Sequence, residues 1–362
     1  MTSIGIIGAG SIGLGIAWRA AQQGARVTVY DPDPGSGPST VAAGMLAAVA
    51  ETHFGEEALS GLSVDSVGRW SGFATELTDA TGHNLEFRSL PTLLMGIEDG
   101  DRDNVARYIQ LYRGLNFDTE ELTGRRARKL EPLLSHRARG GARVDADGEV
   151  DPRLVHSALL QVTAGAGVTL MRQSVTDLDQ LDHDVIVIAA GCGSAAFGLP
   201  VRPVRGVVLR LTASATQAQP RTVVRAFVRG GSVYIVPRSN GEIVVGATSD
   251  ERGFDSATAT AGATYDLLRD AIEVVPEIAE YHLAEMSVNF RPGTPDNLPI
   301  LGWIDPKKRL LAATGHYRQG IALLPATADH LADMALGRSV SGLEPFSPSR
   351  FANSPATPTQ GE

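Results

Sequence analysis

The fold class follows from a stretch near the amino terminus, residues 4–31, with the sequence IGIIGAGSIGLGIAWRAAQQGARVTVYD. The apolar run Ile4–Ile7 predicts a buried strand, and Gly8–Gly13 predicts a turn. A helix is expected over Ser11–Gln23, where apolar residues recur at every fourth position, and a second strand over Arg26–Tyr30. A strand–turn–helix–strand unit of this length is typical of the start of a doubly wound parallel sheet.

Three glycines in this stretch, Gly8, Gly10 and Gly13, match the pattern G-x-G-x-x-G between a strand and a helix. Their expected roles are a tight turn, close approach of the backbone to a pyrophosphate, and packing of the helix on the strand. Asp31 ends the second strand, where a carboxylate can accept both ribose hydroxyls of an adenosine and would repel the 2′-phosphate of NADP. The motif therefore predicts a dinucleotide site but does not choose between FAD and NAD.

The rest of the chain alternates between two patterns. Alternating apolar residues over 203–248, with Gly-Gly and Asn-Gly turns, predict an antiparallel sheet that is followed by a strand ending at Arg291. Further strands are expected at 85–97 (broken at Pro91), 168–171, 184–190, 299–302 and 309–313. Helices are expected at 57–81, 103–115, 119–130, 152–164, 261–274 and 319–336.

These patterns predict an α/β protein with a discontinuous, Rossmann-like nucleotide-binding domain and a second, α+β substrate domain built on an antiparallel sheet. The first domain is expected to comprise residues 1–82, 145–202 and 296–343, and the second residues 83–144 and 203–295. Residues 344–362 are rich in Pro, Ser and Ala and are expected to form a disordered tail.

Composition excludes several classes of function. The 362 residues are 43% hydrophobic and carry a net charge of −9, which disfavours nucleic-acid binding, so the basic run Arg125–Lys129 is interpreted as a solvated helix face. The one cysteine, Cys192, excludes an intramolecular disulfide and a Cys-based zinc cluster, and no metal site is expected. Because no apolar run is long enough for a membrane span and no signal peptide is evident at Met1–Ser3, we expect a cytoplasmic protein.

A second glycine-bracketed turn, ATGHYRQG at 313–320, precedes the last expected helix. The positive end of a helix dipole there would stabilise the negative charge of a reduced flavin, which favours FAD over NAD. An ordinary helix cap is the alternative interpretation.

Four segments together resemble one family. They are AAGMLAAVAE at 42–51, VYIVPRSNGEIVVGAT at 233–248, FRPGTPDNLPILG at 290–302 and GHYRQGIALLPATA at 315–328. In this order they are similar to the D-amino-acid oxidase superfamily, and within it to the glycine oxidases of the thiamine pathway. The resemblance spans about residues 3–338.

The resemblance implies roles for particular residues. Arg291 matches the arginine that binds the amino-acid carboxylate, Tyr234 and Arg318 match residues lining the substrate pocket, and Met45 matches the residue beside the flavin ring. With the glycine motif included, the expected FAD-binding residues are Gly8, Gly10, Ser11, Ile12, Gly13, Asp31, Ala43, Gly44, Met45, Val175, His316, Tyr317, Arg318, Gln319, Gly320, Ile321 and Ala322.

The implied activity is oxidation of glycine by oxygen, giving an imine, then glyoxylate and ammonia, with hydrogen peroxide. The imine is the product that the thiamine pathway uses. A homotetramer is also implied. Ser232 departs from a histidine found in some relatives, and Ala47 and Ala48 also differ, which bears on substrate preference. Segment 289–293 lacks the thiol through which some secondary-amine oxidases attach FAD, so we expect non-covalent FAD.

General chemistry agrees with these roles. Oxidation of an amine moves a hydride from Cα to the flavin, and the protein supplies orientation, for which the planar guanidinium of Arg291 suits a carboxylate. His316 is expected to support the flavin through its backbone, and Cys192 to be a packing residue. A D-amino-acid or proline-type dehydrogenase with another electron acceptor, and a non-catalytic nucleotide-binding protein, remain alternatives.

Overall fold

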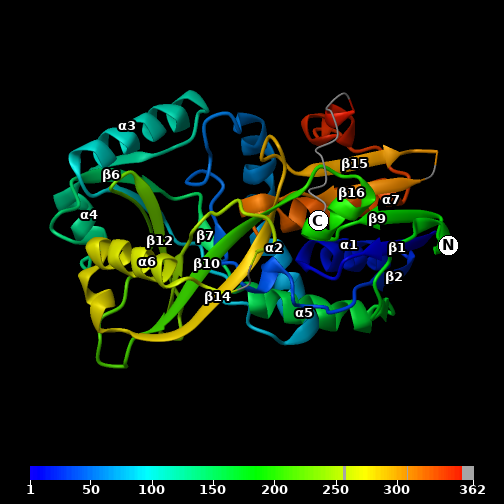
Figure 1. Cartoon of the computed structure of the whole chain (residues 1–362), viewed down its shortest axis with the longest axis horizontal. Coiled ribbons are helices and arrows are strands. Elements are labelled where there is room, and N and C mark those ends of the chain that lie inside the picture. The colour runs from blue at the N-terminus through cyan, green and yellow to red at the C-terminus, as the bar shows by residue number, and fades with distance from the viewer. Residues whose placement is uncertain (256–257, 308, 353–362) are drawn as a thin grey trace.

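The computed structural model describes residues 1–255, 258–307 and 309–352 (Figure 1). In these ranges the chain forms a six-stranded and an eight-stranded sheet, which lie side by side in Figure 1. A short two-stranded sheet, β3 (Met45–Leu46) with β7 (Gly148–Glu149), is a third element.

The six-stranded sheet has the order β15-β16-β9-β1-β2-β8. All its neighbours are parallel except β15 and β16. Its central strands are buried on both faces, as their unbroken apolar sequences require. The strands are β1 (Ser3–Ile7), β2 (Arg26–Tyr30), β8 (Thr169–Met171), β9 (Val185–Ile188), β15 (Ile300–Asp305) and β16 (Leu310–Thr314).

Four helices pack with this sheet into one apolar core. Trp70 of the longest helix is fully buried and donates to the carbonyls of Ile321 and Ala322, so this helix supports the segment that precedes α7. The helices are α1 (Ser11–Gln22), α2 (Glu57–Thr81), α5 (Pro152–Gly165) and α7 (Leu324–Ala335).

The eight-stranded sheet has the order β14-β10-β13-β12-β11-β4-β6-β5. Neighbours are antiparallel except β11 and β4. One face packs against α6 (Ala261–Val274) and α4 (Gly124–Leu130), and the other packs against α3 (Asp99–Gly114) over β4 and β6. The strands are β4 (Thr92–Gly96), β5 (Glu120–Thr123), β6 (Gly140–Val144), β10 (Arg202–Thr212), β11 (Val223–Val228), β12 (Gly231–Pro237), β13 (Glu242–Gly246) and β14 (His282–Gly293).

The fold class is confirmed: a parallel nucleotide-binding sheet and a second, largely antiparallel sheet domain. The helices expected at 57–81 and 261–274 also have the predicted bounds. The proposed division of the chain stays a proposal. Membership of the strands in the two sheets supports it, apart from Arg202, which begins β10.

Three expectations were wrong in part. The helix predicted over 119–130 begins only at Gly124, because residues 120–123 pair with β6 and the Thr123 hydroxyl accepts from the Arg126 amide as a cap. Of the two strands predicted on either side of Pro91, only the second forms, as β4 from Thr92, since Glu86 has a positive φ of 56° that breaks extended backbone in the first.

The last helix begins at Leu324 rather than 319. Tyr317 adopts a φ of 48°, which an α-helix does not contain, and Pro325 fits the first helical turn.

The tail prediction was wrong for its described part. Residues 344–352 include two short 3-10 helices, Glu344–Phe346 and Pro348–Phe351, and Phe346 is 1% exposed. Arg350 binds Asp296 through Nε at 2.8 Å, which ties this segment to the linker before β15. The remainder of the expected tail, 353–362, lies outside the described residues.

None of the helices in the described ranges combines the length and apolarity needed to cross a bilayer.

Candidate active site

The turn between β1 and α1 forms one end of a long cavity. Gly8 has a φ of 110°, and a Cβ there would lie 2.4 Å from the Ala189 carbonyl oxygen, while a Cβ on Gly13 would lie 2.0 Å from the Gly8 oxygen. A side chain at either position would clash with the protein's own backbone, so glycine is required there whether or not a ligand binds. A Cβ on Gly10 would meet nothing nearer than Ser39 Oγ at 3.6 Å, so the space over Gly10 is left for a ligand.

Asp31 lies at the carboxyl end of β2 on the wall of this cavity. Its Oδ2 accepts from the Ala9 amide at 2.7 Å, and its Oδ1 accepts from the Asp33 amide at 2.8 Å. Both bonds hold the carboxylate in one orientation and leave further lone pairs for hydroxyl donors.

The segment Ala43–Met45 continues the cavity wall towards the second sheet. Gly44 has a φ of 77°, and a Cβ there would lie 1.9 Å from the Val150 carbonyl oxygen. The buried Arg238 donates to the carbonyls of Ala43 and Val150 and so fixes this segment from the side of β12.

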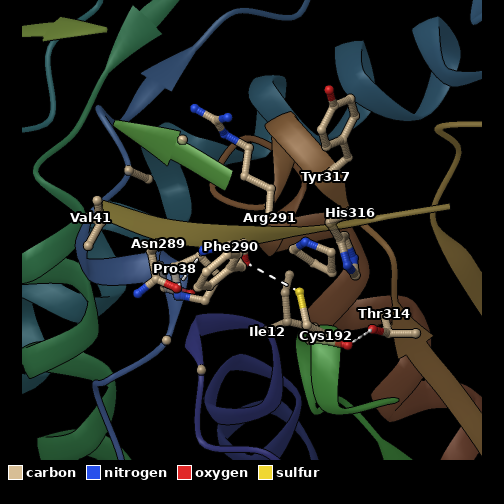
Figure 2. Close-up of a pocket in the computed structure, with 18 of the residues that line it drawn as sticks. Ile12, Pro38, Val41, Cys192, Asn289, Phe290, Arg291, Thr314, His316 and Tyr317 are labelled. Atoms are coloured by element: carbon tan, nitrogen blue, oxygen red, sulfur yellow. Dashed lines mark hydrogen bonds between the residues drawn. The ribbon is translucent and has the colours of Figure 1, made fainter. Parts of the chain in front are cut away.

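Residues of the segment His316–Ile321 also line the cavity, and Figure 2 labels His316 and Tyr317 of this segment. His316 is buried, its Nε2 lies 3.2 Å from Thr327 Oγ1, and burial lowers its pKa to about 3, so its imidazole is neutral. The expected helix dipole does not act directly at this turn, because α7 begins only at Leu324.

The other end of the cavity lies over one face of the eight-stranded sheet. Tyr234 on β12 pairs directly with Arg225 on β11 and with Gly246 on β13. Directly paired residues present their side chains on the same face. A Cβ on Gly246 would lie 2.3 Å from the Tyr234 hydroxyl, so glycine lets the phenol lie flat across β13.

Arg291, on β14, reaches across the sheet to the same place. A Cβ on Gly206 of β10 would lie 2.4 Å from Arg291 Nη1, and this Nη1 donates to the Thr248 carbonyl at 3.0 Å. Figure 2 shows the side chain directed away from Cys192 and Ile12. No carboxylate in the described part of the chain forms a salt bridge with Arg291, and its guanidinium lies on the cavity wall.

Burial raises the pKa of the Tyr234 phenol, although the nearby Arg291 guanidinium acts in the opposite direction. The hydroxyl is therefore protonated and can donate to an anion bound at Arg291.

Arg318 also lies on the wall, but it has a partner. Its Nη2 binds both carboxylate oxygens of Glu56, at 2.8 and 2.7 Å, and its guanidinium stacks over the Tyr317 ring. The Tyr317 hydroxyl lies 3.2 Å from Ser249 Oγ. Arg318 thus shapes this wall, and Arg291 is the freer of the two cations.

Glu51, His53 and Arg225 are among the polar wall residues that the sequence did not reveal. Glu51 ends the segment 42–51 used for the resemblance, but its side chain could not be placed from sequence. Arg225 lies in a recognised strand whose cavity-facing side depends on the register with β12. Burial, and then the charges of Arg225 and Arg318, lower the pKa of His53 to about 2.

Comparison with known proteins identifies the family. The family model described as FAD dependent oxidoreductase matches residues 3–334. The chain belongs to this family of FAD-dependent oxidoreductases. It is 31% identical to the glycine oxidase of Geobacillus kaustophilus over 96% of both chains. The crystal structure of glycine oxidase from this organism superposes with a TM-score of 0.89, at 30% identity over 97% of this chain and 99% of that one.

The bifunctional protein ThiO/ThiG of Synechocystis is also similar, with 32% identity over 96% of this chain. The chain spans 53% of the length of that protein.

The residues of this flavoenzyme fit FAD. Gly10 leaves space over the helix N-terminus, and the Asp31 carboxylate is held on the cavity wall with lone pairs left for hydroxyl donors. The cavity then runs from this dinucleotide end to Arg291 and Tyr234. Among the described residues, no cluster of three His, Cys, Asp or Glu side chains could hold a metal ion.

Most of the residues expected to bind the flavin lie on the cavity wall, and their contacts with FAD stay a prediction. These are Gly8, Gly10, Ile12, Asp31, Ala43, Gly44, Met45, Val175, His316, Tyr317, Arg318, Gly320 and Ile321. The cavity lining does not include Ser11, Gly13, Gln319 or Ala322. The Gln319 amide is used by Ser63 and the Glu51 carbonyl, and the Ala322 carbonyl by Ser66 and Trp70.

Cys192 also lies on the cavity wall, where only a packing role was expected. Its thiol donates to the Phe290 carbonyl at 3.4 Å, the bond drawn in Figure 2, and burial raises its pKa to about 12. A protonated, hydrogen-bonded thiol is a poor nucleophile.

Proposed function

We propose that this flavoenzyme oxidises glycine, or a similarly small amino acid, with oxygen as the electron acceptor. The observation that carries the proposal is the Arg291 guanidinium, which has no carboxylate partner in the described residues. It lies on the wall of the cavity that begins at the glycine turn, residues 8–13. Similarity to glycine oxidase over almost the whole chain supports the substrate.

In the proposed reaction, Arg291 binds the substrate carboxylate through two parallel N–H···O bonds, and the Tyr234 hydroxyl donates a third. This arrangement fixes the direction in which the substrate Cα points. The amine reacts as its free base, after losing a proton to solvent. FAD, when bound, accepts the hydride that leaves Cα and later passes two electrons to oxygen.

The resulting imine would supply thiazole formation in thiamine synthesis, as the similarity to a ThiO/ThiG protein supports. A cytoplasmic location, a homotetramer and non-covalent attachment of FAD are parts of the same proposal. For attachment, acid precipitation should leave the yellow colour in the supernatant, whereas colour in the pellet would indicate a covalent bond.

The decisive experiment is anaerobic addition of glycine to the FAD-loaded protein. Loss of the oxidised flavin absorbance is expected, with a panel of larger amino acids as comparison. Admission of oxygen should restore the absorbance and form hydrogen peroxide in equal amount. Bleaching without reoxidation would indicate a dehydrogenase, and no bleaching by any amino acid would refute an amino-acid-oxidising function.

A further inference from the structure

A buried arginine that the proposed reaction does not use faces the substrate end of the cavity. Arg225 is 7% exposed, lies on the cavity wall and is the direct cross-strand partner of Tyr234. We propose that Arg225 is a second anion-binding group, so that the pocket also accepts amino dicarboxylates. The inference rests on the proposed function for its first anion site, Arg291.

Among the described residues, the Arg225 guanidinium hydrogen-bonds only to uncharged groups. Its Nη1 donates to the Ala50 carbonyl, and its Nη2 lies 3.2 Å from His53 Nε2. No carboxylate in the described ranges lies within salt-bridge distance of it. A buried guanidinium normally has a carboxylate or another anion as its partner, because loss of hydration disfavours an isolated charge.

His53 does not supply the missing negative charge. Its Nδ1 lies 3.0 Å from the Tyr108 hydroxyl, and the strongly lowered pKa described above keeps the ring neutral. Two neutral groups thus orient the guanidinium without cancelling its charge.

The balance of charges at the substrate end points to the class of ligand. Three guanidinium groups, Arg225, Arg291 and Arg318, are accompanied by two carboxylates, Glu51 on the wall and Glu56 bound to Arg318. Glycine in the free-base form that reacts carries one negative charge, which Arg291 binds in the proposed reaction. An amino dicarboxylate carries a second carboxylate, which can bind the guanidinium of Arg225.

The register of the sheet sets the separation of the two anion sites. Arg225 lies on β11, and the Arg291 guanidinium meets Thr248, which follows β13, two strands away. Two strand spacings amount to about 10 Å. Tyr234 lies on the strand between these two places. In the proposed complex, a ligand with a carboxylate at each end extends from one guanidinium to the other.

A binding test needs no turnover. The oxidised FAD-loaded protein is titrated with succinate and with butyrate, which has the same carbon chain and one carboxylate, while flavin absorbance is followed. We expect succinate to bind at least about tenfold more tightly than butyrate to the wild-type protein, a difference typical of one additional charge-assisted contact. Arg225→Met should reduce this ratio to about one, and Arg225→Lys should keep most of it.

Arg221→Met is the matched control, because it removes an exposed arginine just before β11 that does not line the cavity. Its succinate-to-butyrate ratio should equal that of the wild type. Turnover gives a second readout: Arg225→Met should lower kcat/KM for iminodiacetate relative to N-ethylglycine by about tenfold or more.

Equal binding of succinate and butyrate by the wild-type protein would overturn the proposal, even if the Arg225 variants fail to fold. An unchanged ratio in a folded, FAD-loaded Arg225→Met protein would also overturn it, leaving Arg225 as a support for Ala50 and His53. Failure of the proposed function is a separate result, since the binding ratio is measured whether or not glycine reduces the flavin.

Discussion

The two ends of the cavity are built in different ways. At the nucleotide end, residues 8–13 and Asp31 come from one continuous strand–helix–strand unit, and the backbone makes most of the site. At the substrate end, Arg225, Tyr234 and Arg291 come from three strands that are brought into position by pairing across the sheet. A site built from local backbone has a recognisable spacing in the sequence, whereas one built from sheet register does not.

The largest effect is expected from Arg291→Leu. The substrate carboxylate would then be desolvated without a partner, which should lower glycine kcat/KM by a hundredfold or more, or about 3–5 kcal/mol. Arg291→Lys keeps the charge but loses bidentate binding, so its loss should be smaller. An unchanged KM for glycine in the folded, FAD-loaded Leu variant would remove Arg291 from the site, and FAD affinity serves as the control because it should not change.

Asp31→Ala tests the nucleotide end. Loss of the hydrogen bonds to ribose should weaken FAD binding by about 1.5–3 kcal/mol, roughly ten- to a hundredfold. Asp31→Asn retains an oxygen for the amide of Ala9 or Asp33 and separates support of the turn from the effect of charge. Titration of the FAD-free protein measures the affinity, and an Ala variant that binds as tightly as wild type would exclude the ribose contact.

A pair of glycine substitutions compares the two ends directly. Gly206→Ala places a Cβ 2.4 Å from Arg291 Nη1, so the guanidinium must move and KM for glycine should rise by about tenfold, with FAD affinity unchanged. Gly10→Ala meets no protein atom within 3.6 Å, so the FAD-free protein should melt as wild type does while FAD affinity falls. A loss of FAD affinity in Gly206→Ala, or a lower melting temperature of FAD-free Gly10→Ala, would show that the two ends are not independent.

The smallest effect is expected at Asp147, which does not line either end of the cavity. This buried carboxyl accepts from the Val49 amide, and burial raises its pKa to about 7. Because the folded protein holds this proton to a higher pH than the unfolded chain does, the group lowers stability as pH rises from about 4 to about 7.

Asp147→Asn cannot ionise, so it should lose less stability over this range. At pH 8 the Asn variant should melt a few degrees higher than wild type, which corresponds to about 1 kcal/mol in the free energy of unfolding. This figure allows for the cost of burying amide protons that have no acceptor. At pH 5 the advantage should vanish. An equal difference in melting temperature at pH 5 and at pH 8 would show that the pKa of Asp147 does not lie between these two pH values.

The sequence predicted most of the fold because its signals are local. The glycine turn at residues 8–13 and the helix at 57–81 are both recognised from residues that are close together in the sequence. The error at 119–130 shows the limit of such signals, since 120–123 became a strand only through pairing with β6, a distant partner.

The site was predictable to different degrees for the same reason. Arg291, Tyr234 and Arg318 were found through resemblance to a family, and Asp31 through motif spacing. Arg225 and His53 had no signal of either kind, because their importance comes from a cross-strand pair and a contact between segments far apart in the chain.

The order of strands in the six-stranded sheet has a consequence for synthesis on the ribosome. The central strand β9 pairs with β1 on one side and with β16, about 120 residues later, on the other, and α7 packs against α1. The glycine turn, residues 8–13, therefore emerges from the ribosome long before the strand and helix that complete its sheet. A nascent chain that ends before Leu310 leaves one edge of β9 unpaired and one side of α1 exposed, so we expect the cofactor to be captured after translation ends.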